Sequence, residues 1–538
     1  MKRSIAAACC WAALAVAAPA TAATLVVTGT GEPVALDADA CVTGSDGDST
    51  CATLREAINH AASGDVVRFD RALDGAAIEL SLYTNCVTAA DTGSEHCLRP
   101  PGGWAGGTVA QFGPTAFFLT KALTIDGALA GDGAPMTHGV VIERAADAGP
   151  FRLFHIGFDG DLALTGLTLR GGLARGSDSN LSGAALGAGG AVFNQGALRV
   201  EGCTLAANAA VGGASLAGPY ERGGAGVGQS ATDLNGRGGG PNAGGPGGIG
   251  FPNGGAGGNG GFGGGGGAGG MGDYAGHGGS GGFGGGGGYG GDGDVVGGGG
   301  AGGSGGFGGG GGGGGVDGNG GGGNGGGTGF GGGSGFGSAG GAGAGLGGAV
   351  FNDTGRVTLR NSTFSGNTAR GGNAGYGFAG SGYGGAVFNY AGSVAASFVT
   401  FSDNATGGGS GSFGGSADGG AIYSLGDTAA GCAAGGNRCG TGIATLSLVA
   451  SLAVGNVGAY DVVVDRLHAD DGGVSLGGGS ANLIGSARGF DGGFMPISAA
   501  SLGSLADNGG PTYTYLPSPG SSALDAAGDC VDADGAVV

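Results

Sequence analysis

Positive charge is scarce in this sequence: 20 lysines and arginines stand against 40 aspartates and glutamates, and the formal net charge is −20. Such a balance argues against binding to nucleic acid or to an anionic membrane surface. Beyond the N-terminal segment the longest apolar stretch, 443–455, is too short for the roughly 18 residues of a membrane span. We therefore expect no nucleic-acid partner and no membrane span in the mature chain.

The N-terminal segment, 1–22, has its own pattern. A short basic start is followed by an apolar stretch from Ile5 to about Ala18 and by an A-x-A site that ends at Ala22. This order is typical of a secretory signal peptide, which is removed on export. The sequence therefore predicts a protein that is secreted or displayed on the cell surface.

C-x-x-C pairs are also missing, which argues against a zinc site. Eight of the ten cysteines lie beyond residue 22, and six of them form three close pairs along the sequence. In an oxidising compartment such pairs predict disulfides. The expected pairs are Cys41 with Cys51, Cys86 with Cys97, and Cys432 with Cys439. Cys203 and Cys530 have no neighbouring partner in the sequence.

Helical periodicity is absent from most of the chain, and short repeats take its place. The hexapeptide GGAVFN begins at Gly189, Gly347 and Gly384, and the variant GGAIYS begins at Gly419. An asparagine-centred turn follows each repeat, and the last repeats are spaced by roughly 35 to 37 residues. The turn asparagines are Asn208, Asn367, Asn404 and Asn456.

Short strands bounded by glycine and asparagine, repeating at a fixed period, predict a right-handed parallel β-helix, an all-β solenoid. Each coil of such a fold buries its apolar face only by stacking on its neighbours. Asparagines at equivalent corners can hydrogen-bond from coil to coil, so we interpret Asn208, Asn367, Asn404 and Asn456 as a structural ladder.

Three motifs carry family resemblances. The pairing of GGA[VI] with a later FxxN resembles the repeat of the polymorphic outer membrane proteins, which are exported β-helical surface proteins implicated in adhesion. The segment from Cys51 to Ala57 is similar to the CSLREA motif of bacterial surface β-helix proteins, with Ala52 and Thr53 as departures. Residues 505–530 resemble the choice-of-anchor Q domain. In that family the chain continues to a final CDIGA strand, so the resemblance implies an incomplete C-terminal region here.

These features divide the chain into six parts. We expect a signal peptide (1–22), a CSLREA-like N-terminal cap (23–64), a first part of the β-helix (65–211), a glycine-rich insertion (212–345), a second part of the β-helix (346–490) and a choice-of-anchor Q-like C-terminal region (491–538).

The cap itself is expected to hold a short amphipathic helix over residues 53–62. Leu54, Ala57, Ile58 and Ala61 share one face of it, and Thr53 with the acidic residue three positions on has the pattern of a capping box. Such a helix would cover the open first coil of the β-helix. Arg55 and Glu56 are then interpreted as cap residues and not as catalytic groups.

The glycine-rich insertion supports two interpretations. Its composition by itself predicts disorder, because glycine loses the most backbone freedom on folding. However, most non-glycine residues from Asn253 to Gly321 occupy one phase of three. That period matches a three-fold helix without internal hydrogen bonds, and several such helices can pair as a polyglycine II-type bundle. Out-of-phase residues at Asp273, Asp294 and Asp317 suggest corners between runs of roughly 16 to 18 residues, each about 50 Å long.

Sites for chemistry are weakly indicated. Glycosidases need two carboxylates about 5 to 9 Å apart. The best candidates are Asp159 and Asp161, with Asp126 and Asp132 as further acidic turn residues. Since Asp-Gly pairs are common in turns, a structural role is favoured for all of them. Calcium could be held by Asp46 and Asp48, or by Asp292 and Asp294 in a GGYGGDGDV segment; no other cofactor is expected.

The sequence therefore predicts a secreted or cell-surface structural protein of the adhesin-like kind. Its expected partners are host-surface, cell-envelope or carbohydrate ligands. The alternative is a carbohydrate-active β-helix enzyme, either a polysaccharide lyase or a glycoside hydrolase. Adhesion is implied by the family resemblance alone.

Overall fold

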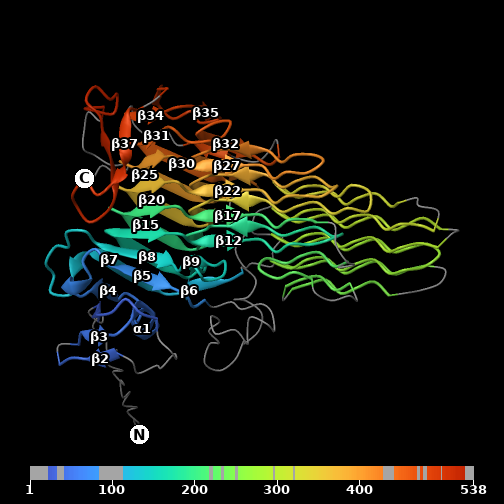
Figure 1. Cartoon of the computed structure of the whole chain (residues 1–538), viewed down its shortest axis with the longest axis horizontal. Helices are drawn as coiled ribbons and strands as arrows, with labels where there is room; N and C mark the ends of the chain where they lie inside the picture. Colours follow the sequence, from blue (N-terminus) through green and yellow to red (C-terminus); the bar gives the residue numbers. More distant parts are fainter. Residues whose placement is uncertain are drawn as a thin grey trace, which may run out of the picture.

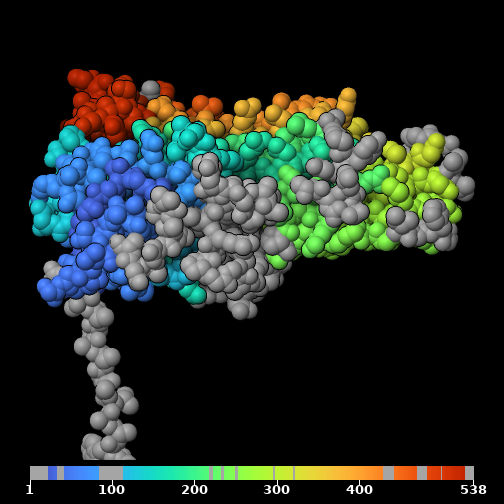
Figure 2. Space-filling model, turned by 60° about the horizontal axis from the view of Figure 1, so that its bottom comes forward, coloured from blue at the N-terminus to red at the C-terminus, as the bar shows by residue number. Residues whose placement is uncertain are grey.

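The protein is a right-handed parallel β-helix with a glycine-rich bundle at its side, as seen in the computed structural model (Figure 1). The structure describes residues 22–32, 41–45, 47–83, 113–216, 222–231, 236–240, 242–248, 253–294, 297–318, 322–427, 442–468, 473–475, 481–498 and 500–526. The N-terminal cap and the C-terminal hairpin lie toward one end of the long axis, and the bundle extends toward the other (Figures 1 and 2).

Three long sheets form the walls of the β-helix. Sheet 1 contains, in spatial order, β2 (Cys41–Thr43), β3 (Ser49–Cys51), β1 (Thr24–Val27), β4 (Val66–Phe69), β7 (Ala122–Ala130), β10 (Asp161–Thr165), β15 (Ala197–Glu201), β20 (Arg356–Arg360), β25 (Ser393–Ser397), β30 (Ala444–Val449) and β33 (Gly473–Ser475). Sheet 2 contains β36 (Phe494–Pro496), β34 (Asn482–Ile484), β31 (Leu452–Ala453), β26 (Thr400–Ser402), β21 (Thr363–Ser365), β16 (Thr204–Ala206), β11 (Leu167–Arg170), β8 (Val140–Arg144) and β5 (Ala77–Leu80). Sheet 3 contains β35 (Ala487–Arg488), β32 (Val462–Arg466), β29 (Ile422–Gly426), β24 (Val387–Tyr390), β19 (Val350–Asp353), β14 (Val192–Asn194), β9 (Arg152–Ile156) and β6 (Thr115–Leu119).

Two four-stranded sheets lie where the chain enters and leaves the glycine-rich bundle. Sheet 4 contains β12 (Leu173–Arg175), β17 (Ala209–Val211), β22 (Thr368–Arg370) and β27 (Ala405–Gly407). Sheet 5 contains β13 (Gly187–Ala188), β18 (Gly345–Leu346), β23 (Gly382–Tyr383) and β28 (Ala417–Asp418). Each central coil thus passes through sheets 3, 1, 2 and 4, leaves the β-helix, and returns through sheet 5.

The coils stack in strict register. Asp161 pairs with Ala197, which lies 36 residues further along, and Arg356 pairs with Ser393, 37 residues further along. Between sheets 4 and 5 four successive coils leave the β-helix, over residues 176–186, 212–344, 371–381 and 408–416. We call these segments excursions. The second of them contains most of the glycine-rich insertion.

The GGAVFN repeat forms strands of sheet 3 and the turn that precedes each of them. In one copy Val350 points into the β-helix core, Phe351 belongs to a second apolar cluster outside the sheet, and Asn352 is buried again. The first glycine of the copy, Gly347, has φ +65°, and a Cβ there would lie 2.2 Å from the Val350 carbonyl oxygen. The repeat is therefore set by a left-handed turn and a period-two strand.

Two asparagine ladders connect the coils. In the first, Asn208 Nδ2 donates to Asn367 Oδ1 at 3.0 Å, Asn367 Nδ2 donates to Asn404 Oδ1 at 2.9 Å, and Asn404 Nδ2 donates to Asn456 Oδ1 at 2.9 Å. In the second, the last residues of the GGAVFN copies, Asn194, Asn352 and Asn389, are joined in the same way at 2.7 and 2.8 Å. All except Asn456 are fully buried, so each amide replaces lost water by a bond to the next coil.

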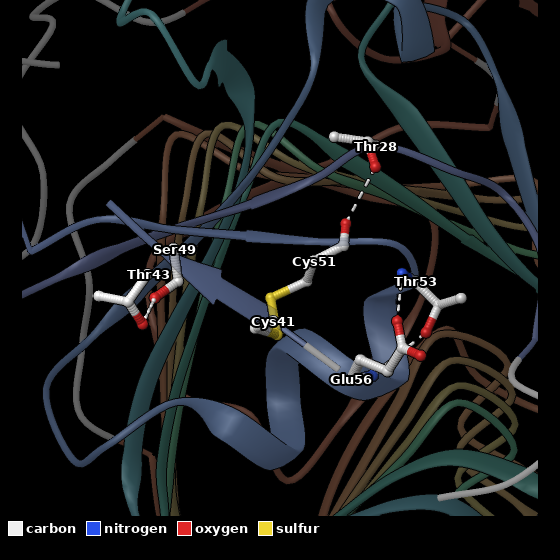
Figure 3. Close-up of a disulfide and its surroundings, with 7 residues drawn as sticks. All are labelled: Thr28, Cys41, Thr43, Ser49, Cys51, Thr53 and Glu56. Carbon is white, nitrogen blue, oxygen red and sulfur yellow. Dashed lines mark hydrogen bonds between the residues drawn. A yellow bond between two sulfur atoms is a disulfide. The ribbon is translucent and has the colours of Figure 1, made fainter. Parts of the chain in front are cut away.

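The N-terminal cap contains the one α-helix of the described residues, α1 (Leu54–His60), with a 3₁₀ turn at Arg71–Leu73. Thr53 and Glu56 form the predicted capping box. The predicted disulfide between Cys41 and Cys51 is also confirmed, and it joins β2 to β3 beside α1 (Figure 3).

Arg55 ties the cap to the first coils. Its buried guanidinium pairs with Glu32 at 2.7 Å and donates to the carbonyl oxygens of Leu82 and Ala116. The same group lies 4.7 Å from the centre of the Phe117 ring. Arg55 is thus part of the cap's attachment to the β-helix.

The C-terminal hairpin, β37 (Leu502–Ala506) and β38 (Thr514–Pro517), lies against sheet 2. Thr204 Oγ1 donates to the Tyr513 carbonyl oxygen at 2.6 Å, and the Tyr515 hydroxyl donates to Asp403 at 2.6 Å. His138 Nδ1 lies 3.0 Å from Asp507 Oδ2. The hairpin therefore spans several coils. No helix among the described residues is long and apolar enough to cross a membrane.

Candidate functional site: the glycine-rich bundle and the corner groove

The glycine-rich bundle is an ordered array of three-fold helices. Along one run the amides of Gly284, Gly287, Gly290 and Gly293, three residues apart, all donate to the same neighbouring run, at the carbonyls of Phe307, Gly310, Gly313 and Val316. The next amides, Gly288 and Gly291, donate to a different run, at Gly279 and Gly276. Tyr289 donates to a third segment, at Arg222. Successive amides thus point in three directions, which identifies a polyglycine II-type bundle.

Close packing explains why these positions are glycine. A Cβ added at Gly288 would lie 2.1 Å from the Gly267 carbonyl oxygen, and one at Gly303 would lie 1.9 Å from that of Gly279. The short excursions belong to the same array, since Gly213 donates to Ala185 and Gly372 donates to Gly343, each at 2.8 Å. The insertion therefore extends an array that every central coil begins.

The predicted runs of 16 to 18 residues are wrong. Each is divided by a turn at a Phe-Gly pair, where the glycine has φ between +71° and +76°. Asp273 does lie at a bend at the other end of its hairpin. The regular spacing of Phe262, Phe283, Phe307 and Phe330, by 21, 24 and 23 residues, was the signal for these turns. A positive φ at the third position of a tight turn favours glycine, so the phenylalanine precedes it.

The four phenylalanines form a stack that fixes the bundle to the β-helix. Their ring centres are 4.7, 5.0 and 5.5 Å apart in sequence order. The stack packs on a second row of aromatic residues on the outer face of sheet 3, with Phe307 4.3 Å from Tyr390 and Phe330 5.9 Å from Phe388. The outward phenylalanines of the GGAVFN repeat are therefore buried by the bundle.

A groove follows the corner between sheets 3 and 1 across five coils. It has a volume of about 700 Å³ and we call it the corner groove. Its floor contains glycines, because a Cβ at Gly355 would lie 2.5 Å from Asn194 Nδ2 and one at Gly392 would lie 2.4 Å from Asn352 Nδ2. The second asparagine ladder also donates to the carbonyls of these glycines, from Asn352 Nδ2 to Gly355 at 2.9 Å and from Asn389 Nδ2 to Gly392 at 3.0 Å. Phe158 and Ile443 lie on its first and fifth coils and are 44% and 38% exposed.

The structure gives the two acidic candidates different surroundings. Asp159 lines the corner groove, and it is the one carboxylate among the described residues of that lining. Asp161 lies on sheet 1 and pairs with Arg199 of the next coil at 3.0 Å.

The other two acidic candidates are held in turns. Asp126 accepts from the amides of Ala128 and Leu129, and Asp132 accepts from Ala134 and pairs with Arg71. The hydrogen bond from the Ala134 amide, together with that from the Arg71 guanidinium, lowers the pKa of Asp132. These contacts fit the turn roles that the sequence favoured.

The calcium candidates that the structure describes have partners within the chain. Asp292 is engaged by Arg222 at 2.6 Å, by the Tyr289 hydroxyl at 3.1 Å and by the Val316 amide. Asp294 hydrogen-bonds Asp273, which raises the pKa of Asp273. Asp48 accepts from the Thr24 amide, and Asp46 lies outside the described residues. Within the described ranges no three His, Cys, Asp or Glu side chains come together as a metal site would require.

The remaining cysteine predictions are untested. Cys86, Cys97, Cys432, Cys439 and Cys530 lie outside the described residues. Cys203 is a buried free thiol, and burial raises its pKa to about 12. It is therefore unreactive near neutral pH.

A buried polar chain beside the corner groove had no sequence signal. Gln195 donates through Nε2 to Asp353 at 2.8 Å, and its Oε1 lies 3.3 Å from His155 Nε2. Burial raises the pKa of Asp353 to about 6. Burial and the nearby charge of Arg152 lower the pKa of His155 to about 3. These groups join three coils, and Gln195 also lines the groove.

Comparisons of the sequence and the structure with known proteins identify no family for this chain. No family model matches the chain, and no curated protein is similar to it. Among solved structures, a rhamnogalacturonan lyase is matched at 12% identity over 93% of this chain and 97% of that chain, with a TM-score of 0.21. So low a score carries no argument about activity, and the fold is defined here by the parallel register of the strands.

Proposed function

We propose that the protein is secreted or displayed on the cell surface, where it acts as a structural, adhesin-like protein without catalytic activity. The glycine-rich bundle carries this proposal. It is a large rigid projection, locked to the β-helix by the phenylalanine stack, that reaches well beyond the coils (Figure 1). A projection of this kind suits contact with another surface. The disulfide between Cys41 and Cys51 supports an oxidising compartment.

One form of the alternative, a glycoside hydrolase, gains no support from the described part of the site. Among the described residues that line the corner groove, Asp159 is the one carboxylate. Both retaining and inverting glycosidases need two carboxyl groups across the scissile bond.

Shortening the bundle tests the proposal. Residues 212–344 would be replaced by the sequence of the excursion 371–381, so that β17 joins β18 as β22 joins β23. Latex beads coated with the wild type or with the shortened chain are then counted on epithelial monolayers and on bacterial cell layers. We expect the wild type to retain several-fold more beads.

A circular dichroism melt of the shortened chain serves as the control, because the β-helix core should stay intact. Equal retention of both kinds of bead, or no retention of beads coated with the wild type, would overturn the proposal. Export is tested separately by fusing residues 1–22 to a periplasmic reporter, which should be cleaved and translocated.

A further inference from the structure

Arg356 stands out among the charged groups of the corner groove. Arg356 is the first residue of β20, and its exposed side chain lines the groove. Its neighbours differ from it, because Asp161 is paired with Arg199 and Asp159 has an interaction within the chain. In the described part of the chain the Arg356 guanidinium has neither a hydrogen bond nor an ion pair. The groove therefore offers one uncompensated positive charge in a protein of net charge −20.

The shape of the groove favours an extended ligand. Neighbouring coils of parallel strands are about 4.8 Å apart, so five coils span about 19 Å. The spacing is close to the length of one pyranose unit in a linear glycan. A compact metabolite would contact one or two coils, whereas a linear polymer can contact all five.

The groove has apolar side chains on its first and fifth coils and hydroxyl groups on its third to fifth coils. Phe158 at one end and Ile443 at the other are exposed apolar surfaces against which a sugar ring can pack. Thr354 and Ser393 present hydroxyl groups from the coils between them, and Thr445 presents one beside Ile443. The backbone floor is rigid because the asparagine ladder fixes its carbonyls. A preformed groove of this kind binds without a large ordering cost.

We propose that the corner groove binds a linear polysaccharide that carries carboxylate groups, with Arg356 as the ion-pair partner of a carboxylate and Phe158 as a stacking surface. Arginine suits this role because its planar guanidinium pairs with both oxygens of a carboxylate. The proposal concerns binding alone, and Asp159 is the one carboxylate among the described residues that line the groove. The groove lies on the β-helix, so this proposal is independent of the role proposed for the bundle.

Binding of defined polymers to the full-length chain tests the proposal. The probes are polygalacturonate and alginate oligomers, each compared with its carboxyl-reduced form, measured by isothermal titration calorimetry. We expect the two uronate polymers to bind and the reduced forms to bind at least tenfold more weakly. The overall negative charge of the protein disfavours unspecific attraction of these polyanions.

Two variants locate the site. Arg356→Gln should weaken binding at least tenfold, in line with the value of hydrogen bonds to charged groups. Phe158→Ala should weaken it several-fold. Arg370→Gln is the matched control, because Arg370 is exposed on β22 outside the groove and loses the same charge. Melting curves should be unchanged for all three.

Several outcomes would overturn the proposal. These are no binding of either uronate polymer by the wild type, equal binding of the carboxyl-reduced forms, equal losses in Arg356→Gln and Arg370→Gln, or an unchanged affinity in Arg356→Gln. Appearance of unsaturated or new reducing ends during the titration would contradict the claim that the polymer is only bound.

Discussion

The β-helix and the glycine-rich bundle are both stacks of repeated segments, but they are stabilised by different interactions. The β-helix has a continuous apolar core with buried asparagine ladders. The bundle has almost no side chains inside it, and its runs are joined by amide-to-carbonyl bonds in three directions. Where the two meet, aromatic stacks form a second core. A segment without apolar side chains can thus be ordered when its ends are fixed to a conventional core.

The largest effect is expected at the aromatic contact between the bundle and the β-helix. Phe307→Ala removes the ring that touches Phe283, Phe330 and Tyr390. We expect a loss of about 4 kcal/mol, within the range for large-to-small changes of aromatic residues in cores. The loss should appear as faster proteolysis of residues 212–344, while the β-helix stays resistant.

Phe336→Ala is the control for this prediction, because Phe336 lies in the same bundle but is 56% exposed. Equal proteolysis of both variants would contradict the anchoring role of the stack.

The hydrogen-bonded array is tested next by adding one methyl group. Gly288→Ala places a Cβ 2.1 Å from the Gly267 carbonyl oxygen, and backbone atoms on the neighbouring run cannot yield easily. We expect a loss of about 3 kcal/mol, measured as lower hydrogen-exchange protection of the bundle amides. Gly298→Ala meets no atom within 4 Å and should leave protection unchanged. A disordered bundle would show no difference between the two.

A smaller effect is expected from the ladder inside the β-helix. Asn367→Ala removes the oxygen that accepts from the buried backbone amide and Nδ2 of Asn208, and it removes the Nδ2 that donates to Asn404. The cost of an unsatisfied buried polar group is about 2 kcal/mol. It should lower the melting temperature of the β-helix and leave protection of the bundle amides unchanged. Asn373→Ala, at an exposed position of an excursion, should change neither.

The smallest expected effect is the change in stability with pH, because the titrations of Asp353 and His155 act in opposite directions. The folded-state pKa of Asp353, about 6, lies above that of an unfolded aspartate, so stability falls as the pH rises from about 4 to 6. The folded-state pKa of His155, about 3, lies below its unfolded value, so stability rises over the same interval. The wild type should therefore change little between pH 4 and 6.

Asp353→Asn removes one of the two titrations and should make the β-helix lose stability toward pH 4. Urea midpoints at pH 4, 5 and 6 measure the slope for both chains. Identical slopes would show that the carboxylate is not buried as described.

Much of the β-helix could be predicted because its signals are local. GGAVFN marks a left-handed turn followed by a strand, and Thr53 with Glu56 marks the start of α1. The three-residue period of the bundle could also be read from the sequence. Its Phe-Gly turns were missed, because each phenylalanine occupies the same one-in-three position as the other non-glycine residues. The corner groove, with Phe158 and Arg356, could not be predicted, since it joins residues from coils that an insertion separates in sequence.

The sequence by itself determined the repeat, the alternation of inward and outward side chains, and the glycine positions, because these depend on backbone angles and on the nearest coil. Only the tertiary structure decided that the outward phenylalanines are buried and that the bundle is ordered. The physical reason is that a polyglycine II helix has no internal hydrogen bonds. Its stability exists only between neighbours, and those neighbours are assembled by the stacking of the coils.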